Sequence, residues 1–218
     1  MTYDLIIFDY DGVVADSELL NSTVMAEQLT AIGLPTSVDD VLAAYTGKRW
    51  RDNRPVVEAA LGGPCPDDFH TNWFATCRAR APHQLKPVPG VLSFLNTRSE
   101  RRCIASSSGP DWIGIGLDLF GLTDHFDGSV FTGLAVERGK PYPDLFLHAA
   151  HSLEADPART LVIEDSEAGV TAGVAAGMTV VGLTAGGHIR DGHAERLVAR
   201  GAHHIADSYA AVGAFMAR

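Results

Sequence analysis

The strongest constraint on the fold is a series of short apolar runs, each about one strand long and each followed by polar or small residues. The first run, residues 4–8, ends in Asp9-Tyr10-Asp11-Gly12. Comparable runs follow at residues 102–105, 160–163 and 178–182, with a weaker one at residues 204–206. Continuous apolar runs of this kind are typical of strands buried on both faces of a parallel sheet. Stretches with helical spacing, such as residues 143–153, lie between them. This alternation predicts a parallel sheet with helices on both faces.

Residues 16–84 have a different pattern and contain no convincing strand. Apolar residues recur at helical spacing, for example at Leu20, Val24 and Leu29, and a cluster of prolines and a glycine at residues 82–90 marks the end of this stretch. We therefore expect an α/β fold with two domains. Residues 1–15 and 85–218 would form a catalytic core with a doubly wound, Rossmann-like parallel sheet. Residues 16–84 would form a helical cap domain, inserted after the first strand.

Composition and charge restrict the classes of function. The 218 residues carry a formal net charge of −10, and 46% are hydrophobic. This balance suits a globular protein, and its acidity disfavours nucleic acid as a partner. The sequence has no apolar run near the roughly 20 residues that span a membrane, so we expect no membrane partner. The three cysteines are widely spaced and match neither a disulfide framework nor a zinc site, which favours a reducing, cytoplasmic setting.

The first candidate site follows the first predicted strand. In extended backbone, residues two apart point to the same side, so Asp9 and Asp11 can share one site at the carboxyl edge of the sheet. Two neighbouring carboxylates suit either a hard metal ion or a nucleophile paired with a general acid. Gly12 would permit the tight turn that follows. The alternative interpretation is an ordinary Asp-Gly turn that caps a helix.

Three further polar motifs follow predicted strands or lie in loops at the same edge. Residues 104–110 end a strand in small hydroxyl residues that include Ser106, and these could hold a phosphate or cap a helix. Lys140 precedes a proline and could present its charge to an anion or lie in an exposed loop. Glu164 and Asp165 end another strand and suit a hard metal ion or a helix cap. Together the four motifs contain the groups that phosphoryl transfer requires.

In this order, the four motifs resemble those of the haloacid dehalogenase-like superfamily. The resemblance covers nearly the whole chain and is strongest to the branch with a helical cap after the first motif, which includes sugar-phosphate phosphatases and β-phosphoglucomutase. It implies a Mg²⁺-dependent phosphatase that acts on a small phosphorylated metabolite through an aspartyl-phosphate. It also implies that the protein works as a monomer.

The resemblance further implies roles for individual residues. Asp9 would be the nucleophile, and Asp11 the general acid and then the base that activates water. Ser106 and Lys140 would hold the phosphate. The Mg²⁺ ligands would be Asp9, the backbone carbonyl of Asp11, Asp165 and, directly or through water, Glu164. Other substrate-binding candidates are Gly12, Ser107 and the cap residues Arg49, Trp50 and Arg51; the alternative for the cap residues is an exposed basic loop with Trp50 packed on the cap.

Two alternative functions stay open at this stage. A phosphosugar mutase of the β-phosphoglucomutase type is disfavoured because Asn21 stands where the mutase has a cap histidine. A non-catalytic module that binds Mg²⁺ or phosphate is disfavoured because Asp9, Asp11 and Lys140 are all present. The presence of Asp11 also argues against dehalogenation and phosphonate hydrolysis.

Overall fold

The core of the protein is a parallel sheet of six strands in the order β3-β2-β1-β4-β5-β6. It is seen in a computed structural model that describes residues 3–126 and 128–217. The strands are β1 (Leu5–Phe8), β2 (Arg101–Ser106), β3 (Val130–Thr132), β4 (Thr160–Glu164), β5 (Thr179–Leu183) and β6 (His204–Ala206). The sequence prediction missed β3, whose three residues are too few to form a recognisable apolar run.

Alternate residues of the central strand pack on opposite faces of the sheet. Leu5 and Ile7 of β1 belong to one buried hydrophobic cluster, and Ile6 and Phe8 belong to another. Both faces therefore need helices to exclude water, and this explains the continuous apolar runs of the sequence. The core helices are α5 (Val91–Asn96), α6 (Pro110–Phe120), α7 (Thr123–Phe126), α8 (Asp144–Ser152), α9 (Glu167–Ala175), α10 (His193–Ala199) and α11 (Tyr209–Met216). The predicted α/β, doubly wound fold class is confirmed.

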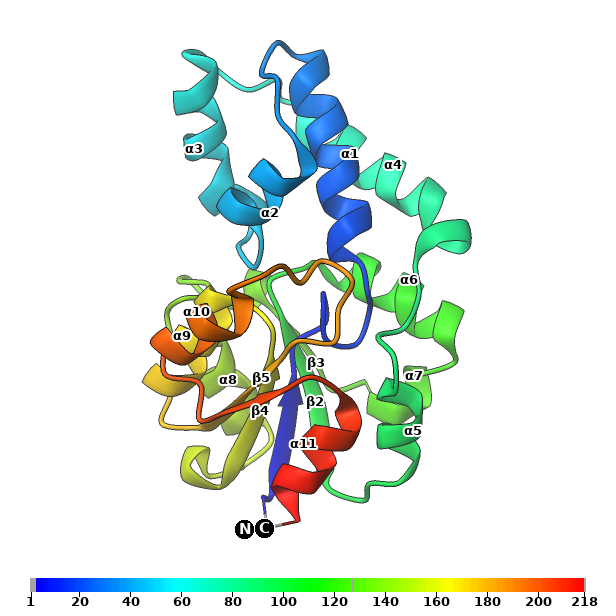
Figure 1. The fold of residues 1–218 in the computed structure, drawn as a ribbon, viewed down its shortest axis with the longest axis vertical. Helices are drawn as coiled ribbons and strands as arrows, with labels where there is room; N and C mark the ends of the chain where they lie inside the picture. Colours follow the sequence, from blue (N-terminus) through cyan, green and yellow to red (C-terminus); the bar gives the residue numbers. More distant parts are fainter. Residues whose placement is uncertain (1–2, 127, 218) are drawn as a thin grey trace.

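The second part of the molecule is a group of helices above the carboxyl edge of the sheet (Figure 1). Its helices are α1 (Glu18–Ala31), α2 (Val38–Tyr45), α3 (Trp50–Leu61) and α4 (Phe69–Gln84). They enclose a hydrophobic cluster of their own that includes Met25, Leu29, Val57 and Phe69. The lower ends of α1 and α4 also join the core cluster through residues such as Leu20. We propose that this group, within residues 16–84, is a cap domain.

The two chain segments that connect the core to these helices run side by side. Ala15 forms an antiparallel bridge with Pro87. The amide of Asp16 donates to the carbonyl of Lys86 at 2.8 Å. The connection between the core and these helices is therefore a pair of hydrogen-bonded chain segments next to the end of β1.

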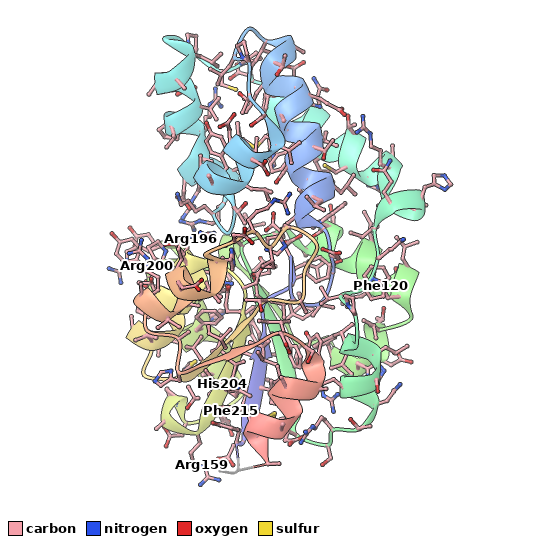
Figure 2. The ribbon with its side chains drawn as sticks, viewed as in Figure 1. Phe120, Arg159, Arg196, Arg200, His204 and Phe215 are labelled. Carbon is pink, nitrogen blue, oxygen red and sulfur yellow. The ribbon has the colours of Figure 1, made fainter. Side chains whose placement is uncertain are left out.

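None of the helices in the described ranges combines the length and the apolar character that a bilayer crossing requires. The three cysteines are free and buried. Figure 2 shows Arg159 at the end of the sheet that faces away from the cap helices, where it pairs with Asp4.

Candidate active site

Register brings the polar motifs of the sequence to one edge of the sheet. β1 lies between β2 and β4, and Phe8 is in register with Ile104 on one side and Ile163 on the other. Asp9 follows β1, and its amide donates to the carbonyl of Ile163 at 3.0 Å. The last residues of the neighbouring strands are Ser106 and Glu164. Parallel pairing thus places these three side chains at the carboxyl edge.

A buried lysine joins two of the carboxylates. Lys140 Nζ lies 3.0 Å from Asp9 Oδ1 and 2.6 Å from Glu164 Oε1, and its side chain is inaccessible to solvent. Burial acts to lower the pKa of Lys140, but the two carboxylates outweigh it, and the net effect is a raised pKa. Lys140 therefore stays charged and supplies a fixed positive charge next to Asp9.

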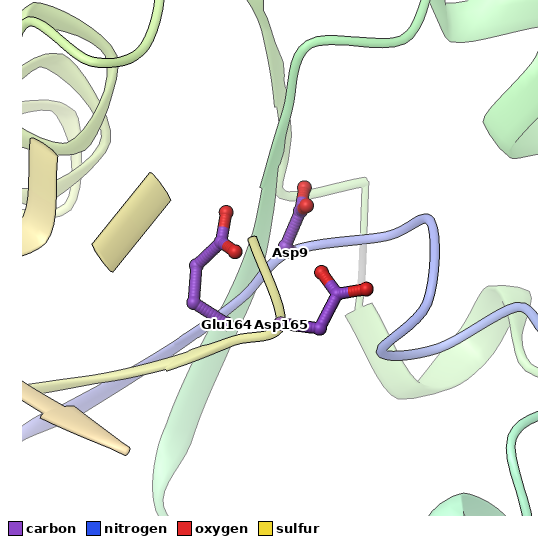
Figure 3. A group of neighbouring side chains, drawn as sticks. All are labelled: Asp9, Glu164 and Asp165. Atoms are coloured by element: carbon purple, nitrogen blue, oxygen red, sulfur yellow. The ribbon is translucent and has the colours of Figure 1, made fainter. Parts of the chain in front are cut away.

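Three carboxylates gather around the same point (Figure 3). Asp9, Glu164 and Asp165 each offer an oxygen, and these oxygens lie within 4.8 Å of one another. Burial raises the pKa of Asp9 and Asp165; Lys140 opposes this shift, whereas neighbouring carboxylates add to it. Asp165 Oδ2 is buried without a hydrogen-bond partner in the described chain. The three carboxylates repel one another, and one of their oxygens has no hydrogen-bond partner among the described residues. A group of oxygen ligands of this kind suits a hard divalent cation.

Two neighbours modify this cluster. Glu164 has both oxygens engaged, because Oε1 pairs with Lys140 and Oε2 accepts from the amide of Ser166 at 2.7 Å. Asp165 and Asp9 are therefore the freer members. His188 Nε2 lies 2.9 Å from Asp165 Oδ2. However, neither of its ring nitrogens is in hydrogen-bond geometry with any described residue. Burial lowers the pKa of His188, so we assign it no charge.

Gly12 is needed for the approach of Asp165. Its φ is +74°, and a Cβ at this position would lie 1.8 Å from Asp165 Oδ2. Any other residue would therefore strain the backbone and displace the carboxylate. The absence of a side chain at Gly12 therefore leaves room for the Asp165 carboxylate in the acidic cluster.

The Asp11 carboxylate points away from the cluster, towards the junction with the cap helices. Its Oδ1 accepts from Trp112 Nε1 at 3.0 Å and from the hydroxyl of Ser17, with Asn21 Nδ2 at 3.4 Å. Its Oδ2 accepts from the hydroxyl of Ser108. The predicted metal contact of Asp11 is its backbone carbonyl, and this stays a prediction. The sequence analysis missed Trp112; its only signal there is a place in the first turn of the helix that follows Pro110.

A cavity of about 70 Å³ lies between the edge of the sheet and the cap helices. Its core side is lined by Asp9, Asp11 and the three serines at positions 106–108. The hydroxyl of Ser106 accepts from the amide of Ser108 at 3.1 Å, and Ser107 Oγ donates to the carbonyl of Gly47 at 3.1 Å. The serine loop therefore lines the cavity and contacts the cap.

The structure does not bring Arg49, Trp50 or Arg51 to this cavity, since none of them lines it. Arg49 is buried and donates to the carbonyls of residues 133, 136 and 137 in the core. Arg51 donates to the same segment. Trp50 stacks on Phe69 at 5.1 Å between ring centroids. In this geometry both guanidinium groups bind the cap to the core, and the substrate-binding interpretation of the three residues has no support.

Comparison with known proteins agrees with this architecture. The family model of haloacid dehalogenase-like hydrolases matches residues 3–177. The chain is 23% identical to the 6-phosphogluconate phosphatase of Escherichia coli (strain K12), over 85% of this chain and 84% of that protein. It is 28% identical to the fructose-1-phosphate phosphatase YqaB of the same strain, over 82% and 95% of the two chains.

A solved structure is also similar along its whole length. It is a conserved haloacid dehalogenase-like protein of unknown function from Agrobacterium tumefaciens str. C58. The two share 33% sequence identity with a TM-score of 0.84, covering 99% of this chain and 100% of that one. The chain belongs to the haloacid dehalogenase-like hydrolases, and its parallel sheet with carboxylates at one edge agrees with that family. The family predicted from the sequence is thereby confirmed, as is the enzyme class of a phosphoric monoester hydrolase.

Proposed function

We propose that the protein is a Mg²⁺-dependent phosphatase that hydrolyses a small sugar phosphate or a similar metabolite through an aspartyl-phosphate on Asp9. The observation that carries the proposal is the buried Asp9–Lys140 pair, 3.0 Å apart, whose Asp9 lines a cavity together with the serine loop. Two relatives support the substrate class, because each is named for a sugar phosphate that it dephosphorylates.

In the first step, an Asp9 carboxylate oxygen attacks phosphorus, and the bond from phosphorus to the substrate oxygen breaks. Asp11 gives its proton to the departing alkoxide. In the second step, Asp11 takes a proton from water, the water oxygen attacks phosphorus, and the acyl-phosphate bond breaks. Asp9 and Asp11 return to their starting states, and the products are an alcohol and inorganic phosphate.

The contacts of Asp11 suit a group that changes its protonation. Trp112 Nε1 can only donate, so it favours Oδ1 as the oxygen that stays an acceptor. The hydroxyl of Ser108 at Oδ2 can rotate and accept instead. We assign the transferable proton to Oδ2, and the tryptophan fixes the orientation of the carboxyl group.

Lys140 and the serine loop provide the remaining electrostatics. The Lys140 ammonium offsets the repulsion between Asp9 and an anionic phosphoryl group, and the hydroxyl of Ser106 can donate to a phosphoryl oxygen. Asp9 and Asp165, with Glu164 nearby, would hold Mg²⁺. When bound, the ion supplies further positive charge for the phosphoryl oxygens. The cap helices limit the water around the reacting groups.

The test is phosphate release from a panel of sugar phosphates, organic-acid phosphates and nucleotides, with Mg²⁺ and with a chelator. We expect metal-dependent release from a few related compounds. We expect Asp9→Asn to lower turnover at least about a thousandfold, and the exposed-site control Asp4→Asn to retain it. Substantial turnover by Asp9→Asn with metal present would refute the covalent mechanism. Isomerised sugar phosphate without free phosphate would identify a mutase instead.

A further inference from the structure

The cap side of the cavity presents buried polar atoms that have no partner in the described chain. Asn53 is 4% exposed and lines the cavity. Its Nδ2 donates to the carbonyl of Tyr45 at 2.9 Å, which fixes the amide so that Oδ1 is the free atom. Oδ1 is buried and accepts no hydrogen bond, and the same holds for the hydroxyl oxygen of Thr46. Buried acceptors of this kind are costly unless a ligand or water donates to them.

Glu18 adds a second acceptor to the same cavity. It begins α1, is 8% exposed and lines the cavity close to Asp11. No residue within 3–126 or 128–217 donates a hydrogen bond or forms an ion pair with its carboxyl group. Whether charged or protonated, a carboxyl group keeps at least one oxygen that accepts a hydroxyl proton.

The other walls suit the carbon skeleton of a substrate more than a second anion. Met25, Val41 and Trp73 line the cap side with apolar surface. The guanidinium groups of Arg49 and Arg51 both donate hydrogen bonds to backbone carbonyls of the core. Among the described residues that line the cavity, the one cation is Lys48. It is exposed, it also borders an outer groove, and its Nζ donates to the carbonyl of Ala44 at 3.2 Å.

We propose that the cap selects an uncharged polyol attached to the phosphate, through hydroxyl groups that donate to Asn53 Oδ1 and to the Glu18 carboxyl. A second phosphate or a carboxylate on the substrate, when ionised, has no proton to donate and would leave these acceptors unpaired. The proposal rests on the proposed phosphatase function and specifies the part of the substrate that does not react. A site built for hydroxyl donors rejects an analogue without them, because its own buried acceptors then stay unpaired.

The experiment compares phosphorylated compounds with different numbers of hydroxyl and anionic groups. A three-carbon series contains glycerol 1-phosphate, propyl phosphate and 3-phosphoglycerate. A six-carbon series contains glucose 6-phosphate, its 2-deoxy analogue, 6-phosphogluconate and fructose 1,6-bisphosphate. In each series that is hydrolysed, we expect the highest kcat/KM for the hydroxylated monophosphate that carries no further charge, glycerol 1-phosphate or glucose 6-phosphate. Its kcat/KM should exceed that of propyl phosphate, and that of the compounds with a carboxylate or a second phosphate, by at least about tenfold.

Variants connect this preference to the two residues. In Asn53→Ala and in Glu18→Ala, which both remove the acceptor oxygen, we expect the ratio of kcat/KM between hydroxylated and hydroxyl-free substrates to fall several-fold. Asn53→Asp keeps an acceptor oxygen and should keep more of the ratio than Asn53→Ala. The matched cap controls Asn72→Ala and Glu27→Ala change exposed residues outside the cavity and should keep the wild-type ratio. Because each ratio is measured within one preparation, partial misfolding does not change it.

The possible outcomes separate the two proposals. No phosphate release by the wild-type protein from any compound would overturn both. Release with equal kcat/KM for glycerol 1-phosphate and propyl phosphate, or a preference for 6-phosphogluconate over glucose 6-phosphate, would overturn the inference about the polyol and leave the phosphatase standing. Unchanged ratios in Asn53→Ala and Glu18→Ala would assign the preference to other residues and also overturn it.

Discussion

Replacing Lys140 with methionine removes the one positive charge that separates two buried carboxylates. Methionine is close to lysine in length and can still pack on the Phe146 ring, over which Lys140 Nζ lies at 4.8 Å. The substitution therefore changes charge more than shape. It leaves Asp9 and Glu164 without the cation that lies 3.0 and 2.6 Å from them.

The magnitude follows from the burial of the group. Loss of one member of a buried ion pair costs about 3–5 kcal/mol, mainly because the remaining charge is desolvated and unpaired. With two partners affected, we expect a loss of about 4 kcal/mol in the free energy of unfolding. For a chain of this size this lowers Tm by roughly 8–16 °C, at about 2–4 °C per kcal/mol. The exposed control Lys86→Met should stay within about 0.5 kcal/mol of wild type.

Thermal unfolding without divalent metal at pH 5 and pH 8 is the assay. The folded variant takes up protons on the unpaired carboxylates more readily than the unfolded chain, so its deficit should shrink as the pH falls. The double variant Lys140→Met/Glu164→Gln should recover part of the stability at pH 8, because one of the two negative charges is gone. A Tm equal to wild type at pH 8, or a deficit that grows at pH 5, would refute the reasoning. If the single variant does not fold, recovery by the double variant still tests it.

Three other predictions concern the same region. Gly12→Ala should lower kcat/KM at least about a hundredfold and weaken the Mg²⁺ dependence, since its Cβ would lie 1.8 Å from Asp165 Oδ2; a Mg²⁺ titration of activity unchanged from wild type would contradict this. Because the pKa of Asp9 and of Asp165 is raised in the metal-free fold, their repulsion grows as the pH rises, and a chelator should lower Tm about twice as much at pH 8 as at pH 5; equal shifts would argue against a metal at this cluster. Gly116→Ala should destabilise the protein by about 1–3 kcal/mol despite the better helix propensity of alanine, because its Cβ would lie 1.8 Å from Tyr10 Oη. Chemical denaturation should show that Tyr10→Phe in the same chain restores most of this loss, and an additive double variant would exclude the steric explanation.

The sequence predicted the parts of the site that depend on strand pairing alone. Asp9, Ser106 and Glu164 each end or follow a buried strand, and parallel register is enough to bring them together. The contact between Trp112 and Asp11 was not predicted, because it depends on how α6 packs beneath the cap, and periodicity does not specify that packing. The direction of Arg49 was also beyond the sequence, since a basic loop next to a cleft can point either way. The Arg49 guanidinium is held by the core carbonyls that accept its hydrogen bonds. It also needs the space at Gly139, where a Cβ would lie 2.5 Å from Arg49 Nε.

The central place of β1 has a consequence for the order of folding. Leu5 pairs with Arg101 on one side and with Thr160 on the other. During synthesis, β1 therefore emerges from the ribosome before the other five strands of the sheet but completes its hydrogen bonds only after β4 has emerged. The cluster that contains Met25 and Phe69 closes over a much shorter stretch of chain. Loop closure over such long separations slows folding, in the millisecond to second range typical of domains rich in non-local pairs. Until β4 arrives, an apolar strand with an open edge is exposed, so the nascent chain is most prone to aggregation before the residues of the candidate site have come together.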